Sequence, residues 1–211
     1  VWPLEYGHQK LSKFGEMMWT DQNYTRYVYS SVTNLLSNKH IPGQGNNKRT
    51  FYYYDRMDRL VLTKDADGNQ LFTKYDILNR PIMTGLFSGT ALPASGNDLY
   101  EEKSTSSSDK YTINQSFPTS GTTVYTATYY DDYDYDGDGT PDTGASYDAP
   151  PSSHASFYDG SANAFVRGKM TGDRTFVLQS SPSRYLTGST FYDRRDRVIQ
   201  TKATNHLDGE M

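Results

Sequence analysis

Short runs of alternating hydrophobic and polar residues, separated by turn-forming residues, recur along most of the chain. Three such runs follow one another at 59–64, 70–75 and 80–83. A six-residue strand spans about 20 Å, which is a normal length for an antiparallel sheet. Further short strands are predicted at 122–130, around Phe157, and at 165–167, 174–179 and 185–192. The pattern predicts an all-β chain of antiparallel hairpins with long polar loops; a short helix is an option only at 98–103.

The first two runs are joined by Asp65-Ala66-Asp67-Gly68-Asn69. Its Asp-Gly pair is among the strongest local signals for a β-hairpin. One face of this hairpin is expected to carry Leu60, Leu62, Leu71 and Tyr75.

A Tyr-Asp-x-x-(Asp/Asn)-Arg motif occurs three times in the chain. The copies are Tyr54-Asp55-x-x-Asp58-Arg59, Tyr75-Asp76-x-x-Asn79-Arg80 and Tyr192-Asp193-x-x-Asp196-Arg197. The first two lie 21 residues apart, and residues 192–202 match residues 54–64 at 7 of 11 positions. Internal repetition of this kind indicates a structural unit that is used repeatedly.

The motif is typical of a strand, a tight turn and a returning strand. The first Asp accepts hydrogen bonds from the turn backbone, and the Asp or Asn three residues later tolerates the left-handed conformation. The following Arg is expected to pair with the motif Asp or to lie over a Tyr ring. A degenerate copy at 29–36 keeps the Tyr and the apolar pair but lacks the Asp and Arg.

These three motifs resemble the Tyr-Asp (YD) repeats of the RHS family, and 74–85 and 191–206 are similar to RHS-repeat proteins of Bacteroidetes-type bacteria. The family pattern has Gly where this chain has Asp58, Asn79 and Asp196. The resemblance implies a large secreted or cell-surface polypeptide whose hairpins coil into a curved sheet or hollow shell, often around a C-terminal toxin or effector. Neither the self-cleaving Asp-Pro-x-Gly motif nor a toxin domain occurs here, so encapsulation is inferred for the parent polypeptide.

Four regions follow from these features. Residues 1–87 form a YD-repeat hairpin region, 88–121 a polar loop or insertion, 122–148 a strand with an Asp-rich loop, and 149–211 further strands ending in a YD repeat.

The Asp-rich loop is the sharpest candidate for binding chemistry. Asp134, Asp136, Asp138 and Asp142 stand at positions 1, 3, 5 and 9, with Gly139 at position 6. Alternating carboxylates with a Gly at the sharp turn suit calcium, and Asp132 or Asp131 can complete the ligand shell. Position 12 is Ala145 rather than the Glu of an EF-hand, so an affinity of about 10⁻⁴ to 10⁻³ M is expected. The alternative is a solvated acidic turn that holds no ion.

Composition narrows the classes of function. The net charge is −4 and no basic stripe is present, which argues against nucleic acid as a partner. Zero Cys excludes a disulfide scaffold, and no segment is apolar enough to span a membrane as a helix. The four His form no metal-ligating pair and no Ser lies in a nucleophile elbow, so an enzyme is not expected.

The expected function is therefore a structural and interaction segment of a secreted or cell-surface bacterial RHS/YD-repeat protein. Its expected partner is the rest of that polypeptide. The alternative is a calcium-dependent adhesin module, in which the Tyr and Arg side chains face outward and bind glycans. Burial of Tyr54, Tyr75 and Tyr192 against neighbouring strands would favour the first, and an open groove lined by them the second.

Overall fold

The chain folds into an antiparallel β-sheet. The computed structural model describes residues 25–42, 48–93, 99–142, 146–149, 151, 153, 161–178 and 184–204, and these contain no α-helix. The strands are β1 (Arg26–Tyr29), β2 (Leu36–His40), β3 (Thr50–Tyr54), β4 (Leu60–Lys64), β5 (Gln70–Tyr75), β6 (Pro81–Phe87), β7 (Thr122–Asp131), β8 (Val166–Val177), β9 (Arg184–Tyr192) and β10 (Val198–Ala203). Within each of the two units described next, the strands follow one another in the sheet in their chain order, so each is an antiparallel meander.

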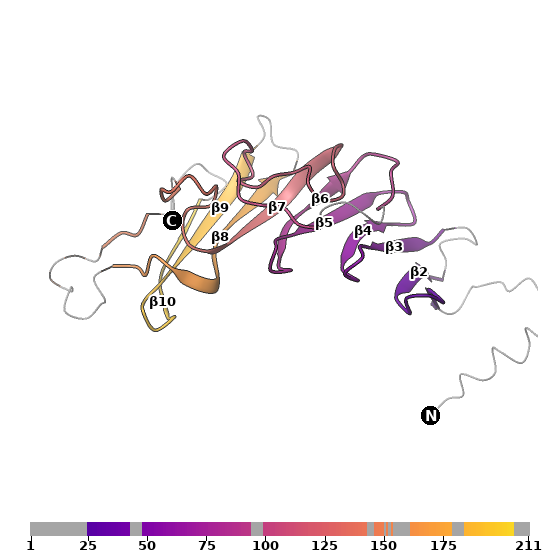
Figure 1. Ribbon diagram of the computed structural model, residues 1–211, viewed down its shortest axis with the longest axis horizontal. Helices are drawn as coiled ribbons and strands as arrows, with labels where there is room; N and C mark the ends of the chain where they lie inside the picture. The colour runs from indigo at the N-terminus through magenta and orange to yellow at the C-terminus, as the bar shows by residue number, and fades with distance from the viewer. Residues whose placement is uncertain are drawn as a thin grey trace, which may run out of the picture. The chain divides into compact units, whose positions relative to one another are not determined.

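The chain divides into two compact units, Val1–Phe51 and Tyr52–Met211. In the first unit β1 pairs with β2, and β2 pairs with β3. In the second unit each strand from β4 to β10 pairs with the next, as Figure 1 shows. The three motif turns, the acidic loop and the cavity described below lie in the second unit.

The predicted strands agree well with the observed ones. The strand predicted at 70–75 has the bounds of β5, and those at 59–64, 122–130 and 185–192 correspond to β4, β7 and β9. The strands predicted at 165–167 and 174–179 are joined in one long strand, β8. A helix at 98–103 is wrong over the described residues 99–103, where Lys103 instead forms a β-bridge with Tyr111. Phe157 lies outside the described residues.

The predicted sharing of faces in the β4–β5 hairpin is wrong. Leu62 pairs directly with Phe72, so these two side chains share a face, and both are almost fully buried. Leu71 pairs with Thr63 on the opposite face and is 51% exposed. A shift of one residue in register moves every side chain of a strand to the other face. The hairpin signal alone did not determine that register.

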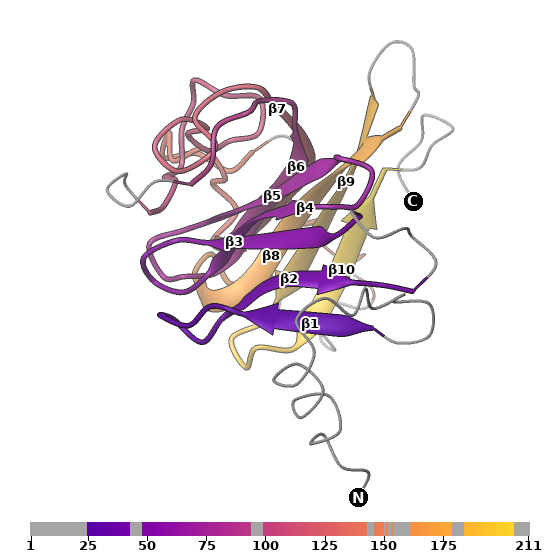
Figure 2. The same ribbon diagram turned by 90° about the vertical axis from the view of Figure 1, so that its right-hand side faces the viewer.

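The core lies between one face of the sheet and two connecting segments. Tyr111 comes from the segment between β6 and β7, and Tyr133 and Tyr135 come from the segment after β7; all three are buried in one cluster with Leu62 and Phe72. Figure 2 shows the two segments coiled together beside β7. The rings of Tyr111, Tyr129 and Tyr135 stack in sequence, with centroids 5.7 and 4.3 Å apart. Aromatic stacking therefore joins the sheet to both segments.

A buried ion pair anchors the β6–β7 segment to the sheet. The Lys74 ammonium on β5 lies 2.6 Å from the Glu101 carboxylate, and neither side chain is more than 1% exposed. Lys74 also donates to the carbonyl oxygens of Ile113, Ser116 and Pro118. Burial lowers the pKa of Lys74, and the Glu101 charge opposes that shift. The polar segment predicted at 88–121 is thus packed against the sheet where it is described.

Candidate functional site

The three predicted repeat turns, residues 54–59, 75–80 and 192–197, share one hydrogen-bonding arrangement. In each, one oxygen of the motif Asp accepts the backbone N–H groups two and four residues later, and the other accepts the Nε–H of the motif Arg. The residue before the Arg has a positive φ of 59° at Asp58, 63° at Asn79 and 62° at Asp196. The predicted left-handed position and the predicted Asp–Arg pair are both confirmed.

Each internal motif Arg also reaches the next Tyr-ended strand. The Arg59 guanidinium lies 4.5 Å from the centre of the Tyr75 ring, and its Nη1 donates to Asn79 Oδ1 at 2.7 Å. Arg80 lies 4.3 Å from the Tyr130 ring and forms two hydrogen bonds to the Asp131 carboxylate. The same side chain therefore closes its own turn and joins it to the neighbouring one.

The connection between β7 and β8 is a further repeat turn, which the sequence analysis missed. Tyr130 pairs with Met170 as Tyr75 pairs with Pro81, and Asp131 accepts the Gly168 N–H at 2.7 Å. Gly168 has a φ of 80°, and Lys169 stands where the other turns have Arg. The turn is split, because 36 residues separate Asp131 from Gly168 instead of two. Its signal in the sequence is Tyr130-Asp131 together with Gly168-Lys169.

The split turn shares the Tyr-hydroxyl contact and the contact of its basic residue with the following turn, whereas no ring contact of Lys169 is formed among the described residues. The Tyr75 hydroxyl donates to Leu60 O, the Tyr130 hydroxyl to Pro81 O and the Tyr192 hydroxyl to Met170 O. In every case the acceptor is the residue that follows the basic residue of the preceding turn. Lys169 in turn lies 3.6 Å from Asp196, as Arg59 contacts Asn79. The contact between successive turns is thus formed at three places.

Two other turns use parts of the same design. Asp65 accepts the N–H groups of Asp67 and Asn69, and Gly68 has a φ of 93°. In the degenerate copy, Ser30 Oγ accepts the N–H groups of Val32 and Thr33. Asn34 there has a φ of 58°, although this turn is one residue longer. A short polar side chain that caps the turn and a left-handed residue are thus the common elements.

The three motif Tyr residues are neither fully buried, as expected for a scaffold, nor fully exposed, as expected for a glycan-binding groove. Tyr54, Tyr75 and Tyr192 are each half-buried. The hydroxyls of Tyr75 and Tyr192 are occupied by carbonyls of adjacent strands, and the Tyr75 ring is covered by Arg59. These contacts of Tyr75 and Tyr192 therefore lie between repeats.

The acidic loop after β7 brings three of its five predicted ligands together. Carboxylate oxygens of Asp134, Asp136 and Asp138 lie within 4.8 Å of one another, so this group can hold a metal ion. Asp134 also accepts the N–H groups of Gly137 and Gly139, which have positive φ. The close grouping of hard oxygen ligands suits a cation such as calcium.

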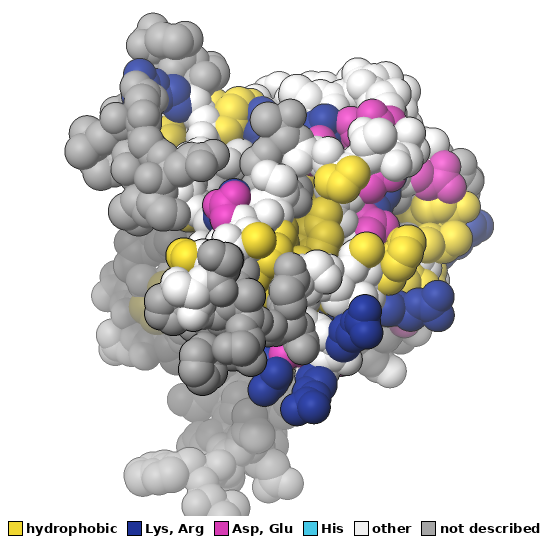
Figure 3. All heavy atoms as spheres, turned by 90° about the vertical axis from the view of Figure 1, so that its left-hand side faces the viewer, with side chains coloured by type: hydrophobic (Ala, Val, Ile, Leu, Met, Phe, Trp, Pro, Cys, Tyr) yellow, Lys and Arg dark blue, Asp and Glu magenta, His cyan; other side chains and the backbone are white. Residues whose placement is uncertain are grey.

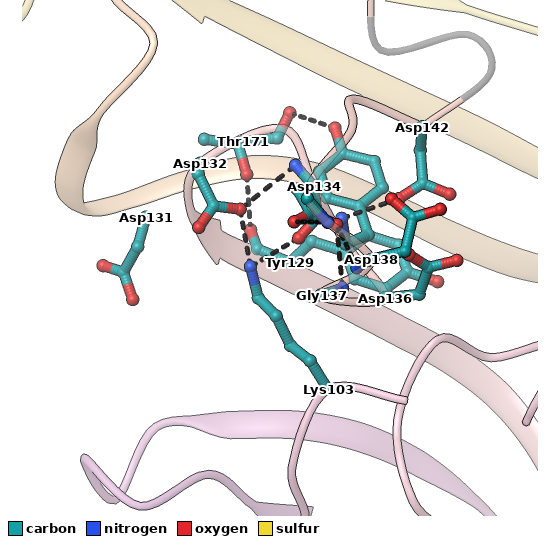
Figure 4. A network of polar contacts seen from close by, with 12 residues as sticks. Lys103, Tyr129, Asp131, Asp132, Asp134, Asp136, Gly137, Asp138, Asp142 and Thr171 are labelled. Carbon is teal, nitrogen blue, oxygen red and sulfur yellow. Dashed lines mark hydrogen bonds and ion pairs between the residues drawn. The ribbon is translucent and has the colours of Figure 1, made fainter. Parts of the chain in front are cut away.

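The other two predicted ligands, Asp132 and Asp142, form ion pairs with lysines of the β6–β7 segment. Lys103 Nζ lies 2.5 Å from Asp132 Oδ1, and it also donates to the Asp134 carbonyl oxygen (Figure 4). Lys110 Nζ lies 2.7 Å from both Asp136 and Asp142. The counter-charge that the acidic loop requires is therefore supplied in part by two lysines that the sequence analysis did not consider.

The pKa values reflect this pairing. The hydrogen bond from Lys110 lowers the pKa of the Asp136 carboxyl, and the bonds to Asp136 and Asp142 raise the pKa of Lys110. In the split turn, the Arg80 hydrogen bonds lower the pKa of Asp131. Burial raises the pKa of Tyr135 to about 12. These shifts favour the charged forms of the Asp136 and Asp131 carboxylates and of the Lys110 ammonium.

A cavity of about 280 Å³ lies beside the acidic loop. Tyr129 and Tyr135 line it together with Lys110, Asp142, Arg174 and Ser189. Arg174 pairs with Asp109 and stacks on Tyr185. The cavity therefore combines an aromatic wall with hydroxyl and charged groups, a composition found in small-ligand sites.

Comparison of the chain with protein-family models and with curated proteins finds no match. None of the described residues forms a helix that is long and apolar enough to cross a membrane.

Proposed function

We propose that this chain is a structural and interaction segment of a secreted or cell-surface bacterial RHS/YD-repeat protein. Its hairpins build part of a β-shell, and the rest of the same polypeptide is its main partner. In the parent protein this shell encloses a C-terminal toxin or effector. The chain itself performs no catalysis in this proposal.

One observation carries the proposal: Arg59 joins its own turn to the ring and the turn of the following repeat. Arg80 does the same one repeat later. Contacts that recur between neighbours, and use the motif residues themselves, are typical of repeat proteins in which each unit packs on the next. The motif residues thereby serve packing between repeats, which supports a scaffold.

Electron cryomicroscopy of the full polypeptide that contains this segment tests the proposal. A hollow β-shell in which these residues form part of the wall, with density for an enclosed domain, is the expected result. A segment that extends from the particle as a separate module, with no enclosed density, would contradict the proposal.

A second candidate function is a calcium-dependent carbohydrate-binding adhesin module. It is favoured by the position of the Asp134, Asp136 and Asp138 group, because Tyr135 and Asp142 of the same loop line the cavity. Calcium bound there would fix the wall of a site for a sugar, with Tyr129 and Tyr135 as the aromatic surface.

A glycan array probed with the chain in calcium and in chelator separates the two functions. Selective binding that requires calcium would favour the adhesin module. Absence of binding in both buffers is expected for the scaffold. Isothermal titration with millimolar calcium tests whether the acidic loop binds the ion. The absence of binding heat would contradict the calcium site.

A further inference from the structure

The last repeat turn is incomplete compared with the internal ones. Arg197 pairs with Asp193 at 2.6 Å, but its side chain is 64% exposed, whereas Arg59 is 11% and Arg80 is 22% exposed. Within the described part of the chain, Arg197 contacts neither an aromatic ring nor the turn of a following repeat, and β10 pairs with β9 alone.

We propose that the β10 edge binds an antiparallel strand that ends in Tyr-Asp and continues into a repeat turn. The incoming Tyr ring lies against the Arg197 guanidinium. The inference rests on the proposed repeat architecture and adds to it the chemistry by which the β10 edge selects its partner.

Three internal junctions define what the partner supplies. The Tyr hydroxyl donates to the carbonyl of the residue after the basic residue, at Leu60, Pro81 and Met170. At β10 the equivalent carbonyl is that of Val198. An oxygen on the incoming turn accepts from the basic residue, as Asn79 does from Arg59 and Asp131 does from Arg80. A strand without the Tyr and this oxygen fills none of these positions.

Within the described residues, β10 is exposed at its start, and two of its later side chains contact Asp148. Val198 is 55% exposed at the start of the strand, and the Gln200 and Lys202 side chains are held by Asp148. Figure 3 views the molecule from the side on which β10 lies in Figure 1, and Lys and Arg side chains gather at the margin of that face. An edge strand with unpaired backbone groups is a template for strand addition, and the Arg adds selectivity.

The test is titration of the isotope-labelled 211-residue chain with a synthetic peptide that copies residues 49–64, followed by NMR. This peptide contains one complete repeat turn with its Tyr. Saturable shifts are expected for the β10 amides and for the Arg197 side-chain Nε–H. A peptide with Ala in place of Tyr54 is expected to bind about tenfold more weakly, because it lacks both the ring and the hydroxyl.

Variants of the chain complete the test. Arg197→Lys keeps a positive charge for Asp193 but lacks the planar group, and it is expected to weaken binding of the wild-type peptide about tenfold. Arg195→Ala in the same turn is the matched control and is expected to bind normally, because only its backbone N–H contacts Asp193. Equal binding of both peptides, or no saturable shift at millimolar peptide, would overturn the inference.

Two further outcomes are informative. Self-association of the chain without peptide, with shifts of the β10 and β1 amides, would identify a second copy of the chain as the occupant. That result would overturn the assignment of the β10 edge to a strand that ends in Tyr-Asp. If the peptide does not bind the chain but the full polypeptide still forms a shell, this inference is overturned and the proposed function is left intact. An absent shell would contradict the proposed function independently of the peptide result.

Discussion

The repeat turns and the β6–β7 segment are stabilised in opposite ways. In a repeat turn the Asp, the left-handed residue and the Arg lie within five residues, and the same bonds recur from copy to copy. The β6–β7 segment is instead held by Lys74 of β5, which bonds to groups 27 to 44 residues away, and each contact occurs once. The first arrangement is local and repeated, whereas the second is long-range and unique. Changes in the two regions should therefore differ in both size and reach.

The largest expected effect is at the buried ion pair. Lys74→Met leaves the Glu101 carboxylate and three carbonyl oxygens without their ammonium partner, and should lower the free energy of unfolding by about 3–5 kcal/mol. Urea denaturation followed by circular dichroism measures this loss. Lys64→Met, at an exposed lysine on the neighbouring strand β4, is the matched control and should change stability by about 0.5 kcal/mol or less. Equal losses in the two variants would show that the buried pair does not anchor the segment.

A smaller effect is expected at an internal repeat turn. Arg59→Ala removes the bonds to Asp55 and Asn79 and the contact with the Tyr75 ring, and should cost about 1–2 kcal/mol. Arg56→Ala, at an exposed position of the same turn, is the control and should be nearly neutral. A double-mutant cycle with Tyr75→Leu should give a coupling of about 0.5–1 kcal/mol. Strict additivity would mean that successive repeats do not support each other through this pair.

The calcium effect should be similar in size but should depend on the buffer. Asp138→Asn keeps an oxygen for Thr140 but removes a charge from the carboxylate group. At a calcium concentration ten times the dissociation constant, a bound ion adds about 1.4 kcal/mol to wild-type stability. The variant should therefore melt at a lower temperature than the wild type in calcium and at the same temperature in chelator. A difference of the same size in both buffers would argue against a bound ion.

The smallest expected effect is the pH dependence of the split turn. Arg80 lowers the pKa of Asp131 below its unfolded value, so the folded state binds fewer protons than the unfolded state. The resulting stabilisation is present above the ordinary Asp pKa of about 3.9, and is lost as the pH falls toward the lowered value. The stability difference between the wild type and Asp131→Asn should be up to about 1 kcal/mol at pH 7. This stability difference, measured by urea denaturation, should be smaller at pH 3 than at pH 7. A difference that does not change with pH would contradict its assignment to the Arg80–Asp131 pair.

The same contrast explains which features the sequence predicted. The bounds of β5 and the left-handed conformation of Asp58, Asn79 and Asp196 were predicted correctly, because adjacent residues determine them. The faces of Leu62 and Leu71 were predicted wrongly, because the pairing register is set between strands.

The candidate site was predicted in the same uneven way. The spacing of Asp134, Asp136 and Asp138 indicated a loop that gathers carboxylates, and the structure brings these three together. Nothing local linked that loop to Lys103 and Lys110, which precede it by more than 20 residues. Long-range ion pairs of this kind depend on how two segments pack, and packing is not encoded in a short motif.

The split turn also bears on protein engineering. The turn between β7 and β8 keeps the Tyr130–Met170 pairing and is closed by the Asp131–Gly168 hydrogen bond, although 36 residues lie between Asp131 and Gly168. The entropy of closing a loop grows only slowly with its length, so the strands on either side hold the two halves in place. Ile77 and Leu78 occupy the equivalent positions of an intact turn and are 65% and 61% exposed. The junction between them is therefore a natural point for grafting a foreign peptide onto this scaffold.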